Sequence, residues 1–289
     1  MSERISRGWS IAKESWAVLK QHPTLLVLPV VSAIAFVLLF GSIAAGLFLL
    51  SDGQTLDSLA DSSQIDSNNP AVYVVAFLFY FVTSFIAIFF NAALVSCALE
   101  AFAGRTPTVG GGLSAALRRL PQIFAWSLVA ATVGLALNIV QSLLREKLGF
   151  LGSLLGGLMD LAWAVVTYFV VPVLVVDGVG PIAAVKRSSA ILKRTWGESI
   201  GGAGGLGVVS FLLMLPVFVL VPLAFLAGDA AGPLLLVLVP LAVLYILVLS
   251  IVFSALNTIF RAGTYVYATT GQAPTSMNPA LLQATFHPK

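Results

Sequence analysis

Six long apolar runs, separated by short polar connections, constrain the fold of this chain more than any other feature. Hydrophobic residues make up 59% of the chain and charged residues only 9%, whereas a soluble domain carries roughly 25% charged residues. Because so little charge cannot cover a water-facing surface, the excess apolar surface must face lipid. A helix of about 20 residues crosses the roughly 30 Å of hydrocarbon in a bilayer.

We therefore predict an all-α fold, a polytopic helical bundle that forms one integral membrane domain over residues 1–289. The six predicted spans cover residues 24–50, 71–97, 121–144, 154–176, 200–226 and 234–260.

The basic residues predict the orientation of these spans, because cytoplasmic connections of membrane proteins are enriched in Lys and Arg. Thirteen of them lie in the two terminal segments and in the connections after the second and fourth spans. The opposite connections hold only Arg145 and Lys147. We expect both termini in the cytoplasm. The same dispersal argues against nucleic-acid binding, which requires a basic patch on one folded surface.

Three segments near the predicted cytoplasmic surface have the composition of amphipathic interfacial helices: residues 4–20, 113–120 and 181–196. In the last of these, helical spacing places Ile182, Val185, Ser189, Leu192 and Trp196 on one side. Its four basic residues fall opposite and on one flank, namely Lys186, Arg187, Lys193 and Arg194. Such a helix lies in the membrane interface with its basic face toward anionic head groups. These four side chains are the candidate lipid contacts, with an orientation signal as the simpler alternative.

A Gly-x-x-Pro motif recurs after the second, fourth and sixth spans, beginning at Gly104, Gly178 and Gly271. Glycine permits the left-handed backbone that ends a helix, and proline suits the first turn of the next helix. The recurrence predicts three hairpins in the same orientation, against the alternative that Gly and Pro recur by chance in turns.

Four polar residues in the third and fourth spans form the only candidate intramembrane cluster: Asn138, Gln141, Arg145 and Asp160. An ionisable residue inside a span is costly, so it usually faces the bundle and has a partner. The cluster has two interpretations, a pathway for a solute or ion and a structural clamp between two helices. The clamp is favoured, and Arg145 is the expected partner of Asp160.

Gly197, Gly201 and Gly205 repeat every four residues at the start of the fifth span, which predicts close helix packing. The overlapping Gly-x-Gly-x-x-Gly motif from Gly202 lacks the preceding strand and the following acid of a nucleotide site. No catalytic residues, cofactor site or metal ligands can be named, since no nucleophile motif or ligand spacing occurs. We expect a non-enzymatic protein.

Four segments resemble an uncharacterised family of bacterial and archaeal six-span integral membrane proteins, a domain of unknown function. They are RGWSIAKESWAVLKQHPTLLVLPVVSAI, FFNAALVSCALE, YFVVPVLVVDGVGP and KRSSAILKRTWGES. The resemblance implies a location in the prokaryotic cytoplasmic membrane and supplies no catalytic residues. A weaker similarity is to the membrane domain of glycerophosphodiester phosphodiesterases, although this chain has no sequence left over for their catalytic domain.

Two functional hypotheses follow. The first is a protein that organises membrane lipids or protein partners through its basic interfacial helices. The second is a small-solute or ion transporter or channel that uses the polar residues of the third and fourth spans. Expected partners are lipids, with a membrane protein or a second copy of the chain as further possibilities.

Overall fold

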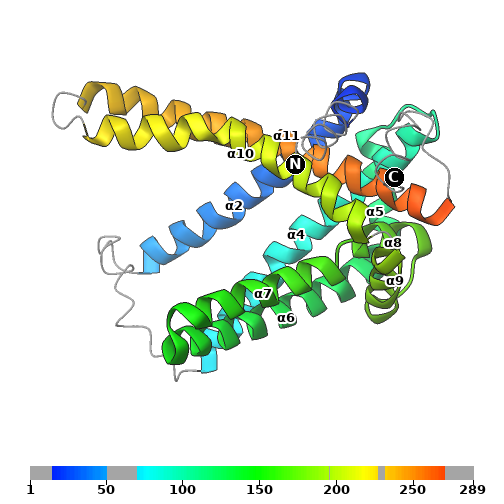
Figure 1. Ribbon diagram of the computed structural model, residues 1–289, viewed down its shortest axis with the longest axis horizontal. Coiled ribbons are helices and arrows are strands. Elements are labelled where there is room, and N and C mark those ends of the chain that lie inside the picture. The colour runs from blue at the N-terminus through cyan, green and yellow to red at the C-terminus, as the bar shows by residue number, and fades with distance from the viewer. Residues whose placement is uncertain (1–14, 51–69, 195, 227–231, 271–289) are drawn as a thin grey trace. The chain divides into compact units, whose positions relative to one another are not determined.

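The computed structural model describes residues 15–50, 70–194, 196–226 and 232–270, and within these ranges it contains helices and no strand. The elements are η1 (Pro23–Leu26), α2 (Val27–Leu50), α4 (Pro70–Phe102), α5 (Val109–Arg118), α6 (Leu120–Leu148), α7 (Phe150–Val166), α8 (Val170–Asp177), α9 (Pro181–Arg194), α10 (Trp196–Leu226) and α11 (Gly232–Thr270) (Figure 1). The predicted all-α class is confirmed.

Six helical segments in the described residues are long and apolar enough to cross a membrane. They are Pro23–Gly46, Tyr73–Phe102, Leu120–Leu148, Phe150–Asp177, Gly204–Pro222 and Leu235–Thr270. Large apolar side chains along them are exposed: Leu236 is 78% exposed and Val37 is 68% exposed. Water would not tolerate so much exposed apolar surface, whereas lipid would.

The chain divides into two compact units. The first unit contains residues 1–29, 94–112 and 191–289, and its α10 and α11 run side by side as a hairpin. In this unit the hydroxyl of Thr24 donates a hydrogen bond to the Pro107 carbonyl at 3.3 Å, which joins η1 to the segment after α4.

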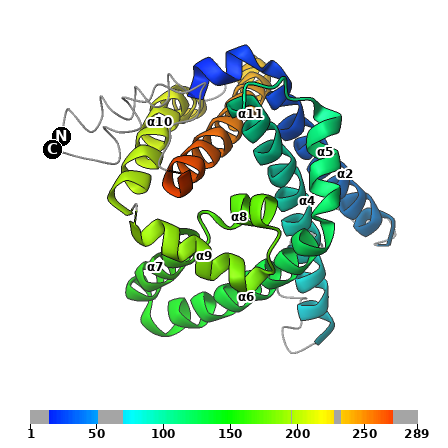
Figure 2. The same cartoon turned by 90° about the vertical axis from the view of Figure 1, so that its right-hand side faces the viewer.

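The second unit contains residues 30–93 and 113–190. Its most extensive helix–helix packing is between α6 and α7, which form a hairpin. Many of the buried side chains of this unit lie near the start of α6 and around α8 and α9. They include Ile123, Trp126, Phe169, Leu174 and Ala184. The short helix α8 lies beside α9, and a turn at Gly178 joins them (Figure 2).

Several helices extend beyond the predicted spans, most of all α4 and α11. The second span was expected to end at residue 97, but α4 continues to Phe102, and α11 continues past the expected residue 260 to Thr270. Hydropathy marks where a chain leaves lipid, whereas a helix continues until its backbone is terminated. For α4 the termination is at Gly104, whose φ of 71° is left-handed.

The fourth span is interrupted, which the sequence did not predict. Helix α7 ends at Val166 and α8 begins at Val170. Pro172 lies in the first turn of α8, where it can neither donate a hydrogen bond to residue 168 nor continue the helix past that carbonyl without a clash. The run YFVVPVL is apolar throughout, so hydropathy alone does not reveal the break.

The expected interfacial helices are described in part. Residues 15–21 are helical, and the rest of the first one, residues 4–14, lies outside the described residues. The second, expected at 113–120, begins earlier as α5 and is separated from α6 by a turn at Arg119. The third ends at Arg194, so Trp196 belongs to α10 instead.

Candidate functional site

The candidate site is the connector between the fourth and fifth spans, where α8 ends at a left-handed glycine. Gly178 has a φ of 64°, and its N–H donates to the Leu174 carbonyl at 3.1 Å. Pro181 then begins α9, as the Gly-x-x-Pro motif predicted. This geometry ends one helix and starts the next within three residues.

The connector at Gly104 is built differently after its glycine. The Arg105 N–H donates to the Glu100 carbonyl at 3.0 Å, which closes the end of α4. The Thr108 hydroxyl then caps α5 by accepting a hydrogen bond from the Gly111 N–H at 3.1 Å. Pro107 therefore precedes the cap and does not lie in the first turn, so this part of the prediction is wrong. Gly271 lies outside the described residues.

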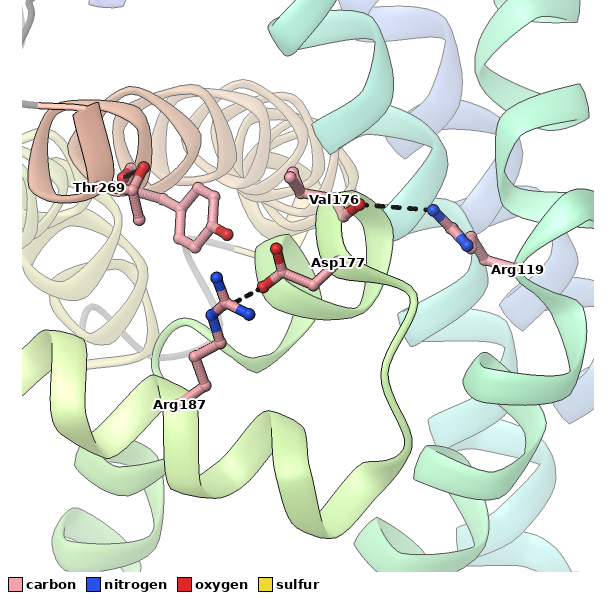
Figure 3. Close-up of polar contacts among 6 residues, drawn as sticks. Arg119, Val176, Asp177, Arg187 and Thr269 are labelled. Carbon is pink, nitrogen blue, oxygen red and sulfur yellow. Dashed lines mark hydrogen bonds and ion pairs between the residues drawn. The ribbon is translucent and has the colours of Figure 1, made fainter.

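Arg119 and Gln122 hold the carboxyl end of α8. The Arg119 guanidinium donates to the Val175 carbonyl at 3.1 Å. It also donates to the Val176 carbonyl at 3.4 Å (Figure 3). The Gln122 amide donates to the Gly178 carbonyl at 3.2 Å. These carbonyls lack partners within α8 because they lie at its end, where a cation also complements the helix dipole. The start of α6 is thereby fixed to the connector.

Ser188 of α9 repairs the break between α7 and α8. Its hydroxyl donates to the Val166 carbonyl at 2.8 Å and accepts a hydrogen bond from the Phe169 N–H at 3.0 Å. Ser188 itself is fully buried, so both hydrogen bonds are shielded from solvent. One hydroxyl thus ties α9 to the broken span.

An ion pair fixes α9 at a second point. Arg187 Nε lies 3.1 Å from a carboxylate oxygen of Asp177 at the end of α8 (Figure 3). The Asp177 side chain is 13% exposed and that of Arg187 is 54% exposed, so solvent screens this pair only in part. Arg187, a predicted lipid contact, therefore makes a protein contact in this structure.

The remaining basic side chains of α9 differ from Arg187. Lys186 and Lys193 are exposed, and the side chain of Arg194 lies outside the described residues. On the other side of the helix, Ala184 and Ser188 are buried against protein, whereas Ile182 is 72% exposed. Leu192 of the predicted apolar side is buried as well, so the buried face overlaps the predicted one only in part.

The polar cluster of the third and fourth spans is brought together in part. The Gln141 amide donates to an Asp160 carboxylate oxygen at 2.8 Å, joining α6 to α7. Arg145 Nε donates instead to the Gln141 carbonyl at 3.3 Å and makes no ion pair with Asp160, so the expected partner was wrong. Asn138 is exposed, and the described residues give its side chain no hydrogen bond.

The close packing of α6 on α7 rests on glycines that the sequence reasoning missed. A Cβ on Gly152 would overlap the Leu144 carbonyl, and a Cβ on Gly156 would lie 3.0 Å from the Gln141 side chain. Gly152-x-x-x-Gly156 followed by Asp160 four residues later was the available signal. Of the predicted packing glycines, Gly205 is partly buried in α10, and the surroundings of Gly197 and Gly201 lie outside the described residues.

We expect Ser188→Ala to lower the free energy of unfolding by about 2 kcal/mol, because the part-buried Val166 carbonyl and the buried Phe169 N–H would both lose their hydrogen bond to Ser188. Ser189→Ala is the matched control, since that hydroxyl bonds only within α9, to the Lys186 carbonyl. Unfolding in mixed detergent micelles measures both. Equal losses for the two variants would contradict the assigned role of Ser188.

Six helices of membrane-spanning length, with apolar side chains exposed along them, define a multi-pass membrane protein. The chain matches the model of DUF6159, a family of unknown function, over residues 70–275. Because this match covers more than half of the chain, the chain belongs to that family. Searches of curated proteins and of solved structures find no match. The resemblance to a family of unknown function is thus confirmed, whereas the phosphodiesterase similarity and the bacterial or archaeal origin stay predictions.

The described residues offer no candidate metal site. Among those residues, no group of three or more His, Cys, Asp or Glu side chains could hold a metal ion.

Proposed function

We propose that this protein binds anionic lipid head groups through α9 and has no enzymatic activity of its own. The observation that carries the proposal is the way in which α9 is attached to the fourth span. Ser188 and Arg187 fix one side of the helix to the fourth span, and Lys186 and Lys193 are exposed. Lysines at a membrane surface attract anionic lipid. Because α9 is already held in place, lipid binding does not have to order the helix.

The proposal includes an orientation and a location. The distribution of basic residues supports a cytoplasmic location for the connectors of α5 and α9 and for both termini, and the family resemblance favours the cytoplasmic membrane of a prokaryote. Exposed Arg105 and Arg118 would then lie on the same side as α9.

Three hairpins in one orientation are part of the same proposal. The antiparallel pairs α6–α7 and α10–α11 support it, as do the left-handed glycines at Gly104 and Gly178. Each hairpin repeat would consist of a surface helix, a span out, a span back and a glycine turn. The basic connector would thus recur along the membrane surface.

Replacing Lys186 and Lys193 together with Gln tests the lipid proposal. Each basic side chain near an anionic surface contributes about 1 kcal/mol, so the double variant should bind about thirtyfold more weakly. The measurement is labelling of α9 by photoreactive phosphatidylglycerol in reconstituted membranes, competed with unlabelled lipid. Phosphatidylcholine should not compete.

The matched control makes the same charge change on the opposite connection, with Arg145→Gln and Lys147→Gln. This variant should leave labelling of α9 unchanged. Unaltered labelling of the Lys186 and Lys193 variant, in protein that remains folded, would overturn the proposal.

A second candidate function is movement of a small solute or ion past Gln141 and Asp160. The supporting observation is a carboxylate within an apolar span that is both exposed and hydrogen-bonded to an amide. Flux in proteoliposomes that is abolished by Asp160→Asn would favour this function, and absence of flux in the unaltered protein would remove it.

A further inference from the structure

Polar side chains lie on an exposed strip of the α6–α7 hairpin, inside the spans. Asn138 and Asp160 are both exposed, and Asp160 accepts a hydrogen bond from the partly buried Gln141. The carboxylate has further acceptor positions, and the described residues give the Asn138 amide no partner. Polar groups exposed in this way would contact lipid tails unless something covers them.

The depths of these two groups are matched. The hairpin turns at Gly149, which has a φ of 54°. Asn138 lies eleven residues before this glycine and Asp160 eleven residues after it. Since each helical residue rises about 1.5 Å, both groups lie about 16 Å from the tip. A donor and an acceptor therefore share one level of the membrane.

Room for another helix exists beside Asp160. Gly157 lies one turn toward the tip on the same side of α7, and a Cβ there would have no atom within 4 Å. Gly157 is exposed, as is Ser153 one turn further on. Small residues at this spacing let helices approach closely in membranes. This small-residue face is separate from Gly152 and Gly156, which pack against α6.

We propose that this strip joins two copies of the chain about a two-fold axis along the membrane normal. Every copy inserts in the same orientation, so groups that meet across such an axis must have equal depth. Asn138 of each copy then donates to Asp160 of the other, and the contact is self-complementary. A second copy has its donor at the required depth. For a different membrane protein, nothing in this chain indicates a donor at that depth. The inference does not depend on lipid binding by α9.

Cysteine cross-linking tests the contact in native membranes. The chain has a single cysteine, Cys97, which is buried. Differently tagged chains carrying Asn138→Cys and Asp160→Cys should form a mixed covalent dimer on oxidation. Leu158→Cys paired with Asn138→Cys is the control, because Leu158 is exposed at a similar depth on the opposite side of α7. Absence of the mixed dimer, or cross-links to another protein in its place, would overturn the proposal.

An exchange of the two side chains tests the pairing itself. Asn138→Asp places carboxylates opposite each other and should weaken association at least tenfold, measured by energy transfer between labelled copies in diluted proteoliposomes. Combining Asn138→Asp with Asp160→Asn restores a donor opposite each acceptor and should return association close to that of the unaltered protein. Failure of the exchange to restore association, or an unaltered protein that stays monomeric, would refute the pairing.

Discussion

Gly152→Ala should lower the free energy of unfolding by about 3 kcal/mol, although alanine is the better helix former by about 1 kcal/mol. The added Cβ would overlap the Leu144 carbonyl, which belongs to the backbone of the facing helix α6 and cannot rotate away. Relief requires the hairpin to separate. Separation would also lengthen the hydrogen bond between Gln141 and Asp160, which is 2.8 Å.

Unfolding by SDS titration in mixed micelles measures this loss. Gly41→Ala is the matched control, because Gly41 lies inside α2 and a Cβ there has no atom within 4 Å. That variant should be unchanged or slightly more stable. Opposite signs for the two substitutions are the expected result, and a neutral Gly152→Ala would show that α6 and α7 do not pack as closely as described.

Gly178→Ala should cost a similar amount, about 3 kcal/mol, for two reasons that add. Alanine in the left-handed region is strained by roughly 1–2 kcal/mol. In addition, its Cβ would overlap the Arg119 guanidinium and displace it from the carbonyls of Val175 and Val176. The end of α8 would lose the contacts that hold it to α6.

Gly104 separates these two contributions. Its φ of 71° is also left-handed, but a Cβ there has no atom within 4 Å. Gly104→Ala should therefore cost only the strain, about 1 kcal/mol. In an Arg119→Ala background, the loss of stability caused by Gly178→Ala should fall to the value expected for Gly104→Ala. If Gly178→Ala costs no more than Gly104→Ala in the unaltered chain, Arg119 does not hold the connector.

Much of the fold was predictable because lipid imposes one strong requirement, a long apolar helix for every crossing. That requirement predicted six spans, and the described residues contain six helices long and apolar enough to cross a membrane. It could not locate the ends of α4 and α11, since a helix ends at a backbone feature and not where hydropathy falls. Nor could it reveal the break before α8. Pro172 breaks its span, but Pro216, Pro222 and Pro240 lie inside continuous helices. At the break before Pro172, Ser188 of α9 bonds to the Val166 carbonyl and the Phe169 N–H, a contact that hydropathy does not reveal.

The site was predictable where its signal was local. The glycine at the end of α8 and the proline at the start of α9 were identified from their spacing alone. The contacts of Ser188 and Arg119 were not, because they join residues 19 to 57 positions apart. The pairing of Asp160 was predicted with the wrong partner, since charge favoured Arg145 while position on the facing helix favours Gln141. The residue spacing in α9 likewise does not show which face of the helix packs against the rest of the protein.

We propose that α9 is held at the cytoplasmic surface of the membrane, with Lys193 exposed. Cysteine accessibility tests it most directly, with Lys193→Cys and Lys147→Cys in separate chains and a maleimide that cannot cross membranes. We expect Lys193→Cys to react only from the cytoplasmic side and Lys147→Cys only from the opposite side. Reaction of both from the same side would contradict it.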